Sequence, residues 1–156
     1  MFRHRRVRNL KKARASGQNR LAVPGLPFAH AAMQYLLLVY TDAELLDKLP
    51  AEDFNTEMRA CLKNSDALMK QGKVLGFQQL QPATTARTVR VRNGRASVID
   101  GPFAETKEML AGFNLVEAAS MEEAVRMAHE LPWTKYGSIE VRPVGDIAAM
   151  RARVGA

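Results

Sequence analysis

Cysteine, histidine and long apolar runs are scarce in this sequence, and each scarcity excludes a class of protein. The single cysteine, Cys61, excludes an intramolecular disulfide framework and a cysteine-rich zinc site, so a reducing cytosol fits best. The three histidines, His4, His30 and His129, are too scattered for metal-ligand spacing. No window approaches the roughly 18 apolar residues of a membrane-spanning helix. We expect a cytoplasmic protein with no membrane partner, no metal and no cofactor.

Acidic residues are missing from the first 32 positions, whereas basic residues are concentrated there. Eight of the 23 Lys and Arg side chains lie in this tail, and the rest of the chain is close to neutral. The net charge of +7 therefore belongs to the tail. We expect residues 1–32 to be disordered and residues 33–156 to form a single domain.

Three interpretations of the tail compete. Translation could start at Met33, because the residues after it begin a strand at once. An organellar transit peptide is also compatible with an arginine-rich, acid-free segment. A phosphate-binding arm for nucleic acid is the third, but no aromatic interleaving or base-reading element accompanies it. A nucleic-acid partner is therefore not expected.

Apolar periodicity predicts strands and helices from residue 34 onward. Residues 34–41 form a nearly continuous apolar run of strand length, which is typical of a central strand. An amphipathic helix should follow Pro50 and stop near Gly72. Its apolar face repeats at steps of three and four through Phe54, Met58, Cys61, Leu62, Ser65, Leu68 and Met69.

The remaining elements complete an alternating pattern. Asn93-Gly94 predicts a hairpin between strands at 88–92 and 95–100, because both central residues of a type I′ turn need positive φ. A capping box at Ser120 and Glu123 opens a second helix that should run to about Leu131. Further strands are predicted at 74–80, 111–117 and 136–144, and a short helix at 146–154. This order predicts an α+β fold of the split βαβ type, with helices on one face of a mainly antiparallel sheet.

The first strand has large apolar side chains on both of its faces. Tyr35, Leu37 and Val39 alternate with Leu36, Leu38 and Tyr40, and Ile139 and Val141 extend the pattern on the last strand. Two long helices can cover only one face of the sheet, and an exposed apolar face of that size is unusual in monomers. We therefore expect a two-fold homodimer with the sheets facing each other.

One segment, Asp100-Gly101-Pro102-Phe103-Ala104-Glu105-Thr106-Lys107-Glu108, resembles a family signature at every position. It is similar to the signature of the YCII-related proteins, in the branch named after the string DGPFAETKE. The resemblance extends from Met33 to about Val144 and includes residues 35–40, 80–82, 88–92, 112–113 and 137–143. It implies a ferredoxin-like fold with an inserted hairpin, forming a dimeric α/β barrel with a pocket near the signature loop.

The resemblance implies no single activity. Some relatives in the wider group act on small aromatic or chlorinated compounds with a histidine and aspartate pair. This sequence keeps Asp100 but has no matching histidine, since His129 lies within the second long helix.

The signature itself offers candidate catalytic residues. Asp100 follows an apolar strand end and precedes Gly-Pro, where its carboxylate could sit partly desolvated at a pocket wall and accept a proton from a substrate. Lys107 could stabilise the resulting anion. The alternative is that Asp100 accepts backbone N–H bonds from Phe103 or Ala104 and fixes the turn.

Other residues of the signature and of the central strands are candidates for binding. Glu105 and Glu108 would share a face if this segment formed a helical turn. They could then serve as an acid–base pair, hold a hard metal ion with water, or form a solvated first turn. Phe103 is a core or interface residue or a substrate stacker. Tyr40 and Arg142 should be neighbours at the sheet centre, where they could bind an anionic group. Arg142 could instead form a structural ion pair with Glu117 or Glu140.

These observations predict a dimer that binds a small, anionic or aromatic molecule beside residues 100–108. The chemistry would be acid–base catalysis of a lyase, isomerase or hydrolase type, with Asp100, Lys107 and Glu108 as catalytic residues. The substrate would contact Tyr40, Phe103, Glu105 and Arg142. The alternative is a non-catalytic ligand-binding or regulatory protein, in which the same loop recognises a metabolite or another protein.

Overall fold

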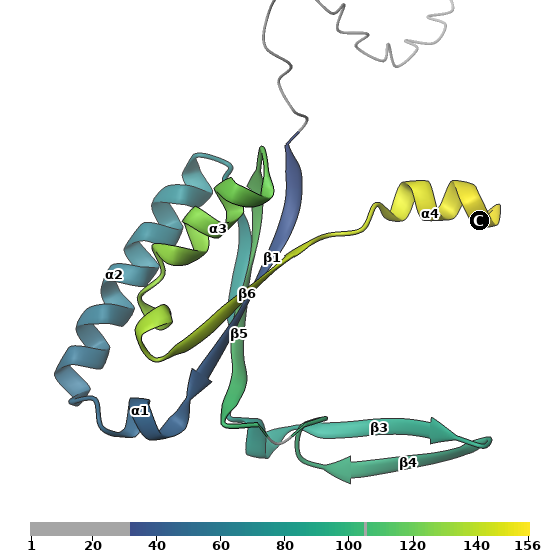
Figure 1. The fold of residues 1–156 in the computed structure, drawn as a ribbon, viewed down its shortest axis with the longest axis horizontal. Helices are drawn as coiled ribbons and strands as arrows, with labels where there is room; N and C mark the ends of the chain where they lie inside the picture. Colours follow the sequence, from purple (N-terminus) through teal and green to yellow (C-terminus); the bar gives the residue numbers. More distant parts are fainter. Residues whose placement is uncertain (1–31, 105) are drawn as a thin grey trace, which may run out of the picture.

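A four-stranded antiparallel sheet forms the centre of the protein (Figure 1). The structure, a computed structural model, describes residues 32–104 and 106–156. Along the sheet the strands are β2 (Val74–Gln79), β5 (Glu108–Ala118), β1 (Met33–Asp42) and β6 (Gly137–Pro143). The helices are α1 (Ala43–Asp47), α2 (Ala51–Lys70), α3 (Met121–His129) and α4 (Ile147–Val154).

The strand order confirms the predicted split βαβ arrangement. Strand β5 lies between β1 and β2, which α2 connects, and β1 lies between β5 and β6, which α3 connects. Figure 1 shows α2 and α3 on the same side of the sheet. The α+β fold with helices on one face is therefore confirmed, and the described residues contain no closed barrel. The expectations for the tail concern residues 1–32, of which 1–31 lie outside the described part of the chain.

Alternation along β1 separates two faces of the sheet. Tyr35, Leu37 and Val39 are buried at 7% exposure or less, facing the helices. The opposite face, which we call the open face, has half-buried side chains instead. The register places Leu36, Leu38, Tyr40, Phe113 and Leu115 on it.

The two long helices approach the sheet differently. Helix α3 buries Ala124 and Ala128, whose small side chains let its backbone lie close to the strands. Helix α2 starts after Pro50 and stops before Gly72, which has a φ of 72°, as the sequence predicted. Its single buried residue is Ser65. Helix α2 therefore packs less tightly over the sheet than its apolar pattern indicated.

The hairpin is confirmed, and it forms a sheet of its own. Strands β3 (Arg87–Arg92) and β4 (Arg95–Asp100) pair around Asn93 and Gly94, whose φ angles are 50° and 72°. Figure 1 shows this hairpin extending away from the main sheet, and α4 extending away at its other end.

Two local expectations differ from the structure. Helix α3 ends at His129 rather than about Leu131, because a separate 3-10 helix begins at Pro132. Glu108 lies in a strand rather than in a helical turn, since it begins β5 and pairs with Asp42, and Glu105 lies outside the described residues. In residues 32–104 and 106–156, no helix has both the length and the apolar character needed to cross a membrane.

A close backbone approach between β2 and β5 gives the first prediction. A Cβ atom at Gly112 would lie 2.6 Å from the carbonyl oxygen of Gln78, whereas a Cβ at Gly76 would meet no atom within 4 Å. Gly112→Ala should therefore lower the free energy of unfolding by about 1 to 3 kcal/mol. Gly76→Ala is the matched control, and urea unfolding should show little change for it. Equal stability of the two variants would contradict this packing.

Candidate functional site

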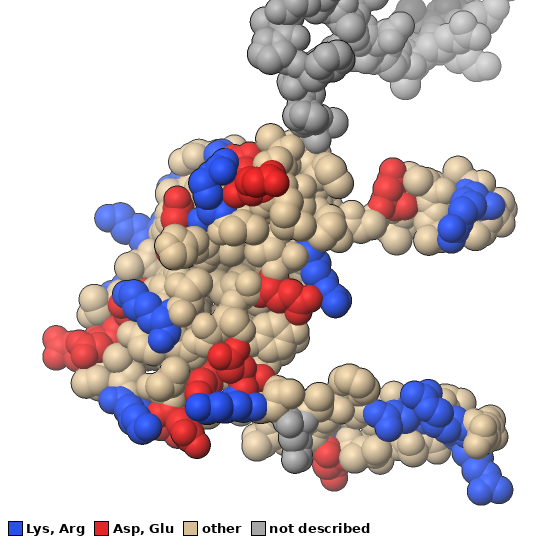
Figure 2. Space-filling view, viewed as in Figure 1, with Lys and Arg blue, Asp and Glu red and all other residues tan. Residues whose placement is uncertain are grey.

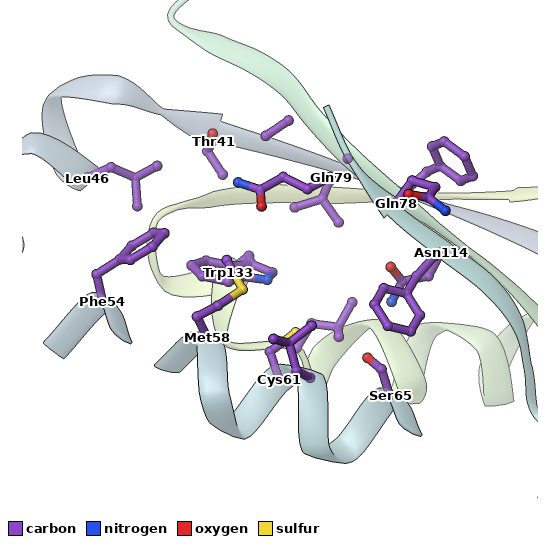
Figure 3. A pocket seen from close by; sticks show the side chains of 17 residues that line it. Thr41, Leu46, Phe54, Met58, Cys61, Ser65, Gln78, Gln79, Asn114 and Trp133 are labelled. Atoms are coloured by element: carbon purple, nitrogen blue, oxygen red, sulfur yellow. The ribbon is translucent and has the colours of Figure 1, made fainter. Parts of the chain in front are cut away.

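A cavity of about 170 Å³ lies between α2 and the helix-covered face of the sheet (Figure 3). Met58, Cys61 and Ser65 of α2 form one wall. The sheet contributes Gln79 and Asn114 opposite them. The space exists because positions under α2 have small or polar side chains where a packed core would have large apolar ones.

Aromatic rings close one end of the cavity. Phe54 of α2 and Trp133, from the 3-10 helix Pro132–Lys135, have ring centroids 5.7 Å apart. Tyr136 packs behind Trp133 at 6.4 Å. An ion pair between Lys135 and Glu57, at 2.6 Å, holds this short helix to α2. The aromatic end is therefore fixed from both elements.

The lining is polar in places but contains no charged side chain. Its side-chain hydrogen-bonding groups are hydroxyls and amides, contributed by Thr41, Ser65, Gln79 and Asn114. No Asp, Glu, Lys, Arg or His belongs to the lining residues. An uncompensated ionic group on a ligand would therefore be desolvated here without a countercharge, which is unfavourable. The cavity suits a neutral molecule.

Cys61 is the one thiol on the wall, and it is not an activated nucleophile. Burial raises the pKa of the Cys61 thiol, while hydrogen bonds with Trp133 and Ser65 act in the opposite direction without reversing it. The thiol therefore stays protonated at neutral pH, and nucleophilic chemistry needs the thiolate. Its place on the apolar face of α2 agrees with the packing role expected from the sequence.

The signature lysine contacts a buried carboxylate that the sequence analysis did not single out. Lys107 Nζ lies 3.2 Å from Asp42 Oδ2, and the Asp42 side chain is only 5% exposed. The other carboxylate oxygen of Asp42 accepts a hydrogen bond from the Glu44 amide at 2.9 Å, which caps α1. Helix α1 in turn places Leu46 in the cavity wall. The signature is thus connected to the cavity through α1.

Both members of this pair have shifted pKa values. Burial acts to raise the pKa of Asp42, but hydrogen bonds from Lys107 and from backbone amides, together with the lysine charge, lower it below the ordinary 3.8. The hydrogen bond and charge of Asp42 raise the pKa of Lys107 above 10.5, and the charge of Glu44 adds to this. Both groups are therefore ionised at neutral pH, and Lys107 is committed to Asp42.

The predicted residues of the sheet centre lie together on the open face. The Tyr40 hydroxyl donates a hydrogen bond to Glu140 at 3.4 Å, and Arg142 pairs with the same carboxylate. Burial and the charge and hydrogen bond of Glu140 raise the pKa of Tyr40, partly offset by Arg142. Glu108 accepts a hydrogen bond from Ser138. Tyr40 and Arg142 lie close together, since both contact Glu140. Arg142 forms the ion pair with Glu140 that the sequence analysis gave as the alternative to anion binding.

Asp100 lies elsewhere, on the projecting hairpin. Its side chain is 88% exposed and pairs with Arg87 at 3.2 Å, rather than lying partly desolvated at a pocket wall. The turn that it was expected to fix is held by the backbone of Gly101, whose amide donates to Ala86 and whose carbonyl accepts from Thr88. Gly101 has a φ of 100°, a backbone conformation that residues other than glycine rarely adopt.

Phe103 follows on the same exposed segment. Its ring is 80% exposed, and the Arg90 guanidinium lies 5.7 Å from its centroid. Phe103 belongs to no hydrophobic core of the described residues. Glu105 lies outside the described residues. The six described candidates therefore form two groups, one on the open face with Lys107 and one on the hairpin, and none of them lines the cavity.

Two features of the sequence point to Asp42 and to the loose packing under α2, which the sequence analysis did not identify. Asp42 stands between a strand and a short helix, with Glu44 two residues later, which is a typical position for a capping carboxylate. Ser65 interrupts the apolar face of α2 at its middle, which marks a place where the helix does not pack on large side chains. Neither signal reveals the cavity itself, because its volume depends on the spacing of α2 and the sheet.

The Asp42–Lys107 pair predicts a pH-dependent stability. Because the pKa of Asp42 is lowered in the folded state, its contribution is present above the ordinary value of 3.8 and is lost as the pH falls through the folded value. Asp42→Asn should be less stable than the wild type in urea unfolding at neutral pH. The difference in unfolding free energy between Asp42→Asn and the wild type should shrink as the pH falls below 3.8 toward the folded pKa of Asp42.

The exposed Asp100 supplies the control for this experiment. Asp100→Asn removes a carboxylate of the same type from an exposed site, so stability should change by no more than about 0.5 kcal/mol at neutral pH. A stability deficit of Asp42→Asn that stays constant down to about pH 3 would show that its charge does not matter.

Known proteins resemble this chain over most of its length. The model of the YCII-related domain matches residues 33–148. The chain is also similar to an uncharacterized protein of Rhizobium meliloti (strain 1021), with 39% identity over 116 residues that cover 72% of this chain and 92% of that protein. The resemblance first carried by residues 100–108 is thereby confirmed: this chain belongs to the YCII-related family.

Proposed function

We propose that this protein binds a small, uncharged and largely apolar molecule in the cavity between α2 and the sheet. The observation that carries the proposal is the lining itself, which joins an aromatic end to hydroxyl and amide groups without any charged side chain. Apolar walls with a few placed polar groups are typical of small-molecule sites.

The volume limits the size of the ligand. A cavity of about 150 Å³ can hold benzene, so about 170 Å³ accommodates one substituted ring. Such a ring would stack near Phe54 and Trp133, and its polar substituent would reach Gln79 or Asn114. Of the anionic and aromatic ligands expected from the sequence, the aromatic one fits this lining.

The geometry favours the non-catalytic alternative over acid–base chemistry inside the cavity. The wall provides neither a carboxylate nor a basic side chain within the described residues, and the Cys61 thiol is protonated. Acid–base chemistry is a second candidate for the open face, where Glu108 accepts a hydrogen bond from Ser138 and Lys107 pairs with Asp42. Loss of turnover in Glu108→Gln with unchanged ligand binding would favour that candidate.

Trp133 provides a direct test of ligand binding, because it is the single tryptophan of the chain and lies in the cavity wall. Uncharged substituted benzenes should change its fluorescence in a saturable way, and their carboxylate analogues should bind at least about tenfold more weakly. Ser65→Leu should fill the cavity and abolish the response. Asn64→Leu changes the exposed neighbour on the same helix and should leave the response intact.

Two outcomes would contradict the proposal. The carboxylates could bind as well as the neutral compounds, which would require a countercharge that the lining lacks. Alternatively, Ser65→Leu could retain the wild-type response, which would place the binding site elsewhere. Thermal unfolding of both variants verifies that each one is folded.

We also propose that the chain forms a homodimer through the open face. Leu36, Leu38 and Leu115 are large apolar side chains on a sheet face that none of the helices in residues 32–104 and 106–156 covers (Figure 1). Burial of such a face against a second copy would be favourable, since apolar burial contributes about 25 cal/mol per Å². A two-fold arrangement would bring the same residues of both copies together.

Sedimentation at micromolar concentration tests the dimer. The wild type should sediment as a dimer, and Leu38→Asp should shift it to monomer, because a charge would be buried at the centre of the interface. Val125→Asp places the same charge on the helix side, where Val125 is 48% exposed, and should remain dimeric. A monomeric wild type would overturn the dimer without affecting the ligand proposal.

A further inference from the structure

The β3–β4 hairpin has one apolar face and one basic face, although it covers no core in this protomer. Cross-strand register pairs Val89 with Val98 on the apolar face, and Arg90 with Ser97 on the other. Val89 and Val98 are 69% and 63% exposed. The apolar face is therefore exposed to solvent in the described part of the chain.

An isolated hairpin of this kind is at best marginally stable in water. Its base is held by the Arg87–Asp100 ion pair and by the hydrogen bonds of Gly101, but the rest extends away from the main sheet (Figure 1). An added surface over Val89 and Val98 would stabilise it by removing apolar area from water.

Helix α4, at the other end of the sheet, also has an exposed apolar face. Ile147, Met150 and Val154 lie at steps of three and four, so they form one stripe, and they are 65%, 46% and 62% exposed. The helix has an Asp146 cap at its start and Gly155 with a φ of 73° at its end. A helix of this length needs packing to persist, because short isolated helices are marginal in water.

Both elements leave the sheet on the side opposite to α2 and α3 (Figure 1). They flank the open face, and the space-filling view shows a wide hollow between them (Figure 2). The hairpin, α4 and the open face therefore border one concave region, and each of the three has exposed or half-buried apolar side chains. We call the hairpin and α4 the two arms.

We propose that the two arms grip a second copy of this chain, each arm packing its apolar stripe on the partner. This inference rests on the proposed dimer through the open face and adds the surfaces that would close around it. A partner that faces the sheet fills the hollow, and its own arms would enclose the first copy under two-fold symmetry.

Charge complementarity favours a second copy as the occupant. Arg90, Arg92 and Arg95 of the hairpin form no ion pair within residues 32–104 and 106–156. Strand β5 presents Glu108 and Glu117 at the open face, and neither of these carboxylates is in an ion pair there. A second copy supplies acidic groups for the arginines at the same time as an apolar surface for the valines.

Paired substitutions in the full-length chain test the arms. Val98→Asp changes the apolar face of the hairpin, and Val125→Asp places the same charge on α3, away from both arms. Ile147→Asp changes the apolar stripe of α4, and Ala148→Asp is the control at the next residue. Both positions lie in the first turn of α4, where an acidic side chain stabilises the helix, so the two variants differ only in the face they change. All four side chains are exposed in the protomer, so each variant should fold, which circular dichroism verifies.

Dimer dissociation constants from sedimentation equilibrium give the result. Val98→Asp and Ile147→Asp should each weaken the dimer by about tenfold or more, whereas Val125→Asp and Ala148→Asp should stay within about twofold. A wild-type constant for either apolar variant would overturn the role of that arm, while the dimer itself would stand if Leu38→Asp still dissociates it. A monomeric wild type would overturn both proposals.

A different occupant of the hairpin would give a different pattern. If the arginine face bound nucleic acid, a labelled single-stranded oligonucleotide would bind with strong salt dependence. Ser97→Asp would weaken that binding, and Val98→Asp would leave both the binding and the dimer unchanged. That pattern would overturn the proposal.

Discussion

Strand β1 presents large apolar side chains to both faces of the sheet, and the helices of the described residues cover only one of these faces. Leu37, at 1% exposure, is closed off by the helix layer, whereas Leu36 and Leu38 remain half-buried on the open face. The apolar side chains of β1 are therefore buried on the helix side, whereas those on the open face would need a further surface to bury them. The assembly proposals follow from this unequal covering.

The helix layer is itself uneven, and the cavity follows from that. Helix α3 lies close to the sheet through Ala124 and Ala128, but α2 faces Gly112 and Asn114 across an open space. The signature supports this region indirectly, because Lys107 holds Asp42. In this protomer, the described part of the signature connects the hairpin and the start of β5 with the cavity wall, through Lys107, Asp42 and α1.

Local sequence patterns predicted the elements well, because each depends on neighbouring residues. Asn93-Gly94 specified the hairpin through its positive φ angles, and Ser120 specified the start of α3 through its side chain, which accepts the Glu123 amide. The environment of Asp100 was not predictable in this way. Its exposure depends on where the hairpin projects relative to the sheet, which is a tertiary property that no local pattern contains.

A crystal structure grown with an uncharged aromatic compound that quenches Trp133 would test the central claim most directly. The account predicts density for the compound between α2 and the sheet, with its ring near Phe54 and Trp133 and its polar group near Asn114. Density at Lys107 and Glu108 on the open face, with the space under α2 filled by side chains, would contradict it.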